Sequence, residues 1–181
     1  MGNRKVGFWR SVGSVLNTRA GARVMESAGG LVNRAAGLAA PDLTGEIPWC
    51  ASRRPIAESR LAVISTAGFY LEGDRPFDVD ALEGDTSFRV LPSNLDPAAL
   101  RIAHAHYPHR WVNEDINVLL PIDHLRRLEE AGVVRLAPRF FSFGYGGQQV
   151  RGYVAPQTGT AHQVARLLRE DEVDLALLVP A

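Results

Sequence analysis

The residues best suited to chemistry lie in one short stretch, from His104 to Asn117. Three of the five histidines in the chain, His104, His106 and His109, fall within six residues. Histidine is the side chain whose unperturbed pKa lies closest to neutral pH, and it is also the commonest metal ligand. The stretch ends on polar groups, among them Asp115, directly before an apolar run. Because polar groups at the edge of a core must be hydrogen-bonded or used, this stretch is the first candidate for a functional site.

The spacing of the three histidines permits more than one interpretation. Two histidines that alternate on an extended segment, with a third nearby, can share one zinc ion. The spacing resembles the HxHxDH loop of metallo-β-lactamase-type hydrolases, but Pro108 stands where that loop has its aspartate. The other two histidines, His124 and His162, fall on predicted helices, where a solvent-facing position is favoured. A metal-dependent hydrolase is therefore kept as an alternative, a hydrogen-bonded structural cluster is a further one, and no metal ligand is assigned.

Composition narrows the class of protein. A chain of 181 residues is long enough for one domain with a core, and 46% apolar with 22% charged residues is the balance of a globular protein. Twenty basic residues balance twenty acidic ones, so a nucleic-acid partner is not expected. The single cysteine, Cys50, cannot form an intrachain disulfide, which favours the cytoplasm. No apolar run has the length of a transmembrane segment, and no signal peptide is recognisable.

The sequence predicts three regions. Residues 1–48 are rich in Arg, Gly and Ala and predict a basic, partly helical N-terminal arm, which could bind a membrane surface or an acidic partner, or pack on a neighbouring subunit of a homo-oligomer. Residues 49–59 contain Pro55 and predict a linker. Residues 60–181 predict an α/β domain.

Within this domain, residues 61–65 form a short apolar run, rich in β-branched side chains, that predicts a strand covered on both faces. The turn that follows contains Thr66 and Gly68. Open α/β sheets bind their ligands at the carboxyl ends of strands, so these two residues are candidates for substrate binding. Residues 87–91 predict a second strand. Residues 100–103 predict a third, which delivers His104 at its end.

The second half of the domain alternates between strands and helices. A helix begins at Pro121 and ends at Gly132, and a helix capped by Thr158 or Thr160 comes later. Strands are predicted over residues 133–137 and 173–179, with a glycine-rich loop between them that holds Phe140, Phe141, Phe143 and Tyr145. The alternation predicts an α/β fold with a mostly parallel sheet and three layers, in a Rossmann-like or flavodoxin-like arrangement.

Several motifs, in order and with sensible gaps, resemble the family of glycine/sarcosine/betaine reductase selenoprotein B and the D-proline reductase subunits. They cover about two-thirds of the chain, and they are Ala62-Val-Ile-Ser-Thr-Ala-Gly68, Arg75-Pro-Phe-Asp78, Gly84-Asp-Thr-Ser-Phe-Arg89, His104-x-His-Tyr107, Glu114-Asp-Ile-Asn117, Ala137-Pro-Arg139 and Ala165 to Pro180. Each motif alone is weak, and together they are specific.

This resemblance implies an oxidoreductase subunit that reductively cleaves a carbon–heteroatom bond in an amine or amino-acid-like substrate. His104, His106 and His109 would protonate the leaving amine or stabilise an anionic nucleophile, with Asp115 in support. The substrate-binding residues would be Thr66, Gly68, Tyr107 and Asn117. The resemblance also implies a pyruvoyl-type partner subunit and a thioredoxin-like reductant.

In that family the strand that matches residues 174–180 is followed at once by a redox motif that begins with selenocysteine or cysteine. We therefore expect a selenocysteine just beyond Ala181, and a chain that stops before it because UGA was read as a stop codon. Selenolates and thiolates are effective nucleophiles because they are ionised near neutral pH. Without that residue the 181-residue chain should be inactive, and no cofactor is expected in it. A non-catalytic assembly subunit with the same fold is the remaining alternative.

Overall fold

The computed structural model describes residues 50–81, 84–146, 150–155 and 157–181, together with Ala20, Gly21, Arg23, Ser27 and Ala28. Apart from these five residues, the arm predicted over residues 1–48 lies outside the described part. Of the predicted linker, residues 50–59 are described, and they include the short 3-10 helix η1 (Ile56–Glu58).

The main sheet is built around β1 (Arg60–Ser65), and most of it is parallel. β7 (Leu175–Val179) pairs with β1 in parallel along one edge, and β5 (Arg135–Leu136) and β6 (Arg139–Phe143) pair with it in parallel along the other. β3 (Phe88–Pro92) extends the sheet by antiparallel pairing with β6. The prediction of an α/β fold with a mostly parallel sheet is confirmed, while the finer Rossmann-like or flavodoxin-like arrangement stays a prediction.

The predicted third strand does not join this sheet. It is β4 (Leu100–Ile102), and it pairs antiparallel with β2 (Phe69–Leu71) in a separate two-stranded sheet. β2 follows β1 after a turn of three residues, too short for a crossover, so the chain leaves the main sheet there and returns with β3. The segment that carries His104 therefore enters the site from the small sheet.

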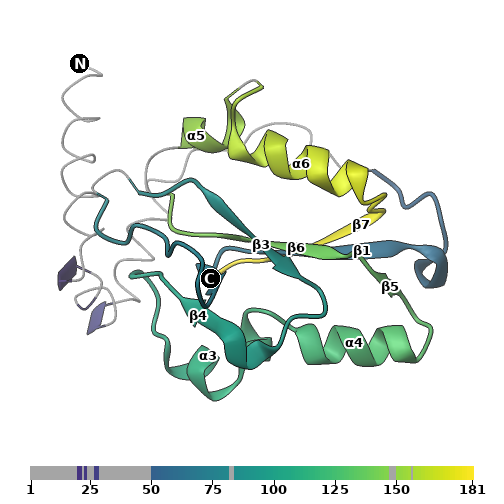
Figure 1. The fold of residues 1–181 in the computed structure, drawn as a ribbon, viewed down its shortest axis with the longest axis horizontal. Coiled ribbons are helices and arrows are strands. Elements are labelled where there is room, and N and C mark those ends of the chain that lie inside the picture. Colours follow the sequence, from purple (N-terminus) through teal and green to yellow (C-terminus); the bar gives the residue numbers. More distant parts are fainter. Residues whose placement is uncertain are drawn as a thin grey trace.

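Helices lie on both sides of the main sheet (Figure 1). α5 (Val150–Val154) and α6 (Thr160–Glu170) lie on one side, and α4 (Ile122–Glu130) and α3 (Arg110–Glu114) lie on the other. The 3-10 helices η2 (Pro97–Ala99) and η3 (Ile116–Val118) complete the described elements. The apolar stripes of the two longer helices are buried at Ile122, Leu125 and Val164, whereas Leu128 is exposed.

Two further expectations were wrong in detail. Residues 139–143 form strand β6 in the middle of the sheet, where a loop was predicted. Gly159, not a threonine, is the N-cap of α6, and the Thr160 hydroxyl donates to the carbonyl of Thr86 instead. β7 is an edge strand, and its Leu178 is 68% exposed.

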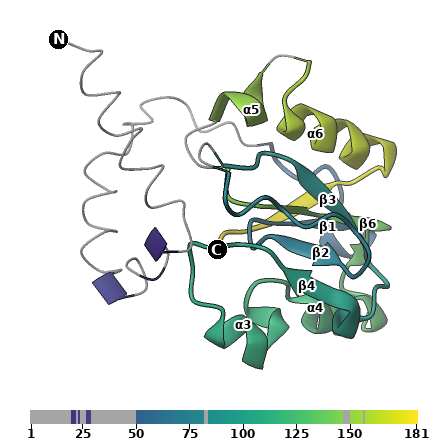
Figure 2. The ribbon, with the colours of Figure 1, turned by 60° about the vertical axis from the view of Figure 1, so that its left-hand side comes forward.

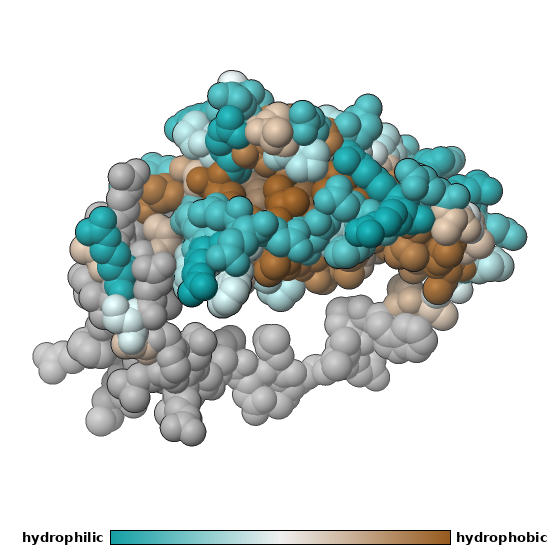
Figure 3. Space-filling model, turned by 90° about the horizontal axis from the view of Figure 1, so that it is seen from below, coloured by the Kyte–Doolittle hydropathy of each residue, from teal (hydrophilic) through white to brown (hydrophobic). Residues whose placement is uncertain are grey.

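The face seen from below carries a band of hydrophilic residues, with hydrophobic residues beside it and at its right-hand end (Figure 3). Exposed apolar side chains such as Val118 and Leu128 belong to η3 and α4, which lie on this side of the sheet. Among the described residues, no helix has both the length and the apolar character that crossing a membrane requires.

Gly68 joins the two sheets through its backbone. Its N–H donates to the carbonyl of Phe143 at the end of β6 (2.9 Å), and its carbonyl accepts from the N–H of Ala103 at the end of β4 (2.9 Å). Its φ is +72°, and a Cβ placed there would lie 2.5 Å from the Ala103 oxygen and 3.0 Å from the Cβ of His104. Only glycine fits both the backbone angle and the space.

We therefore expect Gly68→Ala to destabilise the protein more than backbone strain alone would. Gly132→Ala is the matched control, because Gly132 has a φ of +71° and a Cβ added there would meet nothing within 4 Å. The control should cost about 1–2 kcal/mol, and Gly68→Ala should cost roughly 2 kcal/mol more, from overpacking. Urea denaturation of both variants measures the difference. Equal losses would show that Ala103 and His104 yield without cost.

Candidate functional site

The segment after β4 and the loop after β6 meet in a cluster of aromatic and imidazole rings. Tyr107 lies between two histidine rings, with centroids 4.7 Å from His104 and 4.8 Å from His109. His106 packs against Tyr145, on the loop after β6, at 3.9 Å, and Tyr145 also meets His104 edge-on at 5.9 Å. The cluster is thus assembled from two segments that are distant in the sequence.

His104 is the most buried of the three histidines, with 7% of its surface exposed. Its Nδ1 accepts a hydrogen bond from the backbone N–H of His106 at 3.1 Å. Burial, and secondly the repulsion of a charged ring by His106 and His109, lowers the pKa of His104 to about 4. Burial also lowers the pKa of His106. At neutral pH His104 is therefore an uncharged imidazole.

Tyr107 is fixed by its phenol, which donates to the carbonyl of Ala67 at 2.8 Å. Burial raises its pKa, and that of Tyr145, above the ordinary value. Both phenols are therefore protonated at neutral pH. Tyr107 ties the segment that follows β4 to the turn after β1, which places the three histidines at the carboxyl edge of the main sheet.

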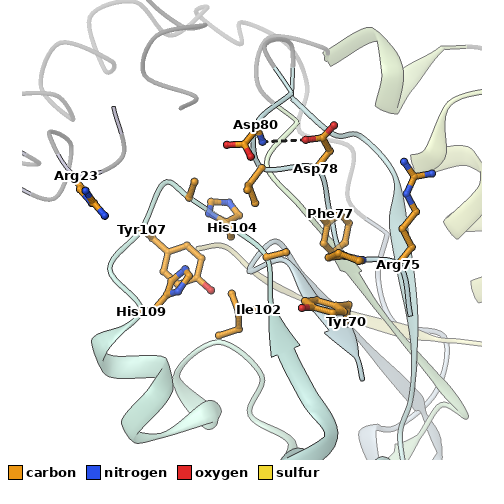
Figure 4. Close-up of a pocket in the computed structure, with 14 residues that line it drawn as sticks. Arg23, Tyr70, Arg75, Phe77, Asp78, Asp80, Ile102, His104, Tyr107 and His109 are labelled. Atoms are coloured by element: carbon orange, nitrogen blue, oxygen red, sulfur yellow. Dashed lines mark hydrogen bonds between the residues drawn. The ribbon is translucent and has the colours of Figure 1, made fainter. Parts of the chain in front are cut away.

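A pocket of about 970 Å³ opens beside this cluster (Figure 4). His104, Tyr107 and His109 line one side, and Figure 4 shows Asp78 and Asp80 above them and Tyr70 at the side. The remaining charged lining residues are Arg23 and Arg75. His106 does not line this pocket; it faces a much smaller cavity together with Tyr145. The pocket therefore combines carboxylates, guanidinium groups and imidazoles, which suits a small polar molecule with charges of both signs.

Two of the three predicted catalytic histidines thus reach the main pocket. In the part of the chain that the structure describes, the Nε2 atoms of His106 and His109 are buried and have no hydrogen-bond partner. A buried polar atom without a partner is unfavourable unless a bound molecule satisfies it. These two atoms are places where a ligand or a solvent molecule would be stabilised.

Asp115 and Asn117 lie elsewhere. The Asp115 carboxylate caps η3 and accepts from the backbone and side chain of Asn117, at 2.9 Å each, and these hydrogen bonds lower its pKa. The Asn117 side-chain amide donates to the carboxylate of Asp123 at the start of α4, and its oxygen accepts from the backbone N–H of Asp123. Neither residue lines the pocket. The structure gives them a role in joining η3 to α4, and their predicted catalytic and substrate-binding roles stay untested.

Thr66 and Gly68 lie in the turn after β1, at the predicted edge. Thr66 is exposed, and its Oγ1 accepts from the backbone N–H of Ala181 at 2.9 Å. In Figures 1 and 2 the C-terminal residue lies beside the start of the segment that follows β4. Gly68 contributes through its backbone, as described above. Substrate binding by either residue stays a prediction.

The described residues do not support the metal alternative. Among them, no group of three or more His, Cys, Asp or Glu side chains is placed to hold a metal ion. His124 and His162 are exposed on α4 and α6, as expected from their positions on the helices. Cys50 is exposed and lies outside the pocket lining.

Sequence reasoning missed several lining residues. Asp78 and Asp80, with Tyr70 and Phe77, come from the loop after β2 and from β2 itself, which was not predicted. The Arg75-Pro-Phe-Asp78 motif could have indicated this part of the pocket, because it contains two of these lining residues. It supports the family resemblance, but none of its residues was named as a site candidate. Tyr145, which lines the smaller cavity, was placed in a glycine-rich loop but was not named as a site residue.

The fold and the site define an α/β protein with an imidazole-lined pocket at the carboxyl edge of its sheet. The family model of glycine/sarcosine/betaine reductase selenoprotein B matches residues 82–181, and the chain belongs to this family. D-proline reductase subunit gamma of Acetoanaerobium sticklandii is 34% identical over 132 residues, which are 72% of this chain and 52% of that relative. The chain thus spans about half the length of this curated relative. The comparison with solved structures found no match.

The low pKa of His104 predicts a loss of stability in acid. The unfolded chain binds a proton near pH 6.5 and the folded chain only near pH 4, so stability is complete above pH 6.5 and falls as the pH drops between these values. The loss should be on the order of 3 kcal/mol at pH 4, with His106 acting in the same direction. Urea denaturation across this range measures it. The decrease in the free energy of unfolding with falling pH should be smaller in His104→Gln and unchanged in His124→Gln. A wild-type free energy of unfolding that stays constant from pH 7 to pH 4.5 would contradict the burial of a neutral imidazole.

Proposed function

We propose that this chain forms the histidine-lined half of a reductase subunit that cleaves a carbon–heteroatom bond in an amine or amino-acid-like substrate. Membership of the selenoprotein B family supports the reductase class. The observation that carries the proposal for this chain is the pocket in which His104, Tyr107 and His109 face Asp78 and Asp80. In this arrangement a carboxylate binds the ammonium group of the substrate. The imidazoles protonate the leaving amine or stabilise the anionic nucleophile.

The nucleophile in this proposal is a selenocysteine or cysteine supplied by sequence that follows Ala181. Two observations support it. The chain spans about half of its curated relative, and β7 delivers Ala181 to Thr66, at the same edge of the sheet as the pocket. A chalcogenolate in that position attacks carbon while the bond to nitrogen breaks, and the leaving nitrogen takes a proton. A second thiol then attacks the selenium or sulfur, which breaks its bond to carbon, and the carbon takes a proton. The Se–S or S–S bond formed in this way is reduced to regenerate the nucleophile. A thioredoxin-like reductant supplies the two electrons, a pyruvoyl-type subunit is the assembly partner, and the protein acts in the cytoplasm.

The first measurement is the DNA sequence downstream of codon 181. We expect an in-frame UGA followed by a cysteine codon and further coding sequence. A different stop codon without a continuing frame would remove the proposed source of the nucleophile and leave the assembly-subunit alternative.

The second measurement is activity. The chain extended through this frame, combined with its partner subunit, is assayed with dithiothreitol on glycine, sarcosine, betaine and D-proline. We expect turnover of at least one of them, none from the 181-residue chain, and none when the selenocysteine is replaced by serine. Asp78→Asn should raise KM by about tenfold, because one charged hydrogen bond to the substrate is worth about 1.5–3 kcal/mol. Asp96→Asn, on the exposed cap of η2, is the matched control. Turnover by the serine variant would disprove the proposal.

A further inference from the structure

The hydrogen bond between the His106 backbone and the His104 ring decides which nitrogen of His104 carries the proton. A backbone N–H can only donate, so the nitrogen that faces it must accept. That nitrogen is Nδ1, at 3.1 Å. An uncharged His104 therefore has its proton on Nε2. Because the bond comes from the main chain, no rotation of the His106 side chain can remove it.

The surroundings of His104 keep the ring uncharged and leave Nε2 for the pocket. The ring is enclosed by His106, Tyr107 and Tyr145, which offer no negative charge. His104 lines both the main pocket and the smaller cavity. In the described part of the chain, its Nε2 is not among the buried side-chain atoms without a partner. It is the one polar atom of the ring that a bound molecule can reach.

Some of the charged groups around the pocket favour protonation of the His104 ring, and others oppose it. From the loop after β2, Asp78 and Asp80 would favour a protonated ring, while Arg75 and Arg23, together with His106 and His109 from the segment after β4, oppose it. Burial is the largest influence on His104, and it opposes the charge as well. The balance favours the neutral ring over the range in which most enzymes work.

We propose that His104 is a neutral hydrogen-bond donor in this pocket, whose Nε2–H binds a carboxylate or thiolate of the bound molecule, and that His106 is a positioning residue that acts through its backbone N–H. His104 is then not the group that protonates a leaving amine. His109, the other histidine that lines the pocket, is left as the candidate for that step. The tautomer is independent of the proposed function, and only the identity of the bound anion rests on it.

The tautomer is measured directly by long-range ¹H–¹⁵N correlation spectra of the ¹⁵N-histidine-labelled 181-residue chain. We expect an unprotonated Nδ1 and a protonated Nε2 for His104, unchanged between pH 8 and pH 5.5. His106→Ala retains the backbone N–H and should leave this pattern intact. His106→Pro removes the N–H and should give a mixture of tautomers. An imidazolium or an Nδ1-protonated ring in the wild-type chain at pH 7 would overturn the proposal, whether or not the proline variant folds.

Anion binding is tested with acetate as the probe. In the wild-type chain we expect a titratable shift of the His104 Nε2–H resonance. The amide of His104→Gln offers a donor near the position of Nε2 and cannot be protonated near neutral pH. The dissociation constant of this variant for acetate should therefore stay within about twofold of the wild type. His104→Ala, which has no donor, should bind acetate about tenfold more weakly. His162→Gln, on the exposed side of α6, is the control. Equal weakening in the glutamine and alanine variants would overturn the donor role.

In the extended, active protein the same pair of variants separates the two proposals. If His104 is a donor, the glutamine variant retains at least tenfold more kcat than the alanine variant, and if His104 transfers a proton, both lose activity equally. The spectra require no turnover. Correct spectra without turnover would therefore count against the proposed function alone, and turnover with a charged His104 would count against this inference alone.

Discussion

The structure depends on one backbone contact, the pair of hydrogen bonds through which Gly68 joins the end of β6 to the end of β4. These strands belong to different sheets, and no other described strand pairing links the sheets. Phe143 directly precedes the loop of Tyr145, and Ala103 directly precedes His104. By holding Phe143 and Ala103, Gly68 places an aromatic ring from one sheet against imidazoles from the other. The site is thus a consequence of how the sheets meet and not of either sheet alone.

The main sheet supplies the rigid side of this junction. Ala62, Val63 and Ser65 of β1 are fully buried, and the Ser65 hydroxyl donates to the carbonyl of Leu119, which secures the segment before α4. The small sheet is only three residues long on each strand, so most of its stability must come from packing of Phe69 and Leu100 in the main core. Tyr107 adds a further tie to the carbonyl of Ala67. The segment that carries the histidines is therefore held to the β1–β2 turn at its start, through Ala103, and in its middle, through Tyr107.

The sequence was sufficient for those parts of the fold in which local pattern and tertiary environment agree. β1 is a continuous apolar run, and α4 has a proline start, a periodic apolar face and Gly132 at its end, so both were predicted. β6 was missed because its aromatic residues run directly into glycines, and only pairing with β1 and β3 makes the segment a strand. β2 is too short for its pattern to be recognised. The histidine cluster was found from spacing alone. Asp78 and Asp80 come near it because the loop that carries them follows β2, which pairs with β4, and Tyr145 comes near it only through the meeting of the two sheets.

Burial changes what a histidine cluster can do. In water each of three imidazoles would be partly protonated near neutral pH. A ring that is only 7% exposed, as His104 is, loses the solvation that stabilises its charge. Such a ring does not take up a proton near neutral pH, but it donates its hydrogen bond in a fixed direction. The direction is set by the main chain of His106, which is indifferent to pH and to the rotamer of its own side chain. A reaction that generates or uses an anion gains from a donor that is already oriented and that needs no proton from solvent, since little reorganisation is then required as charge develops.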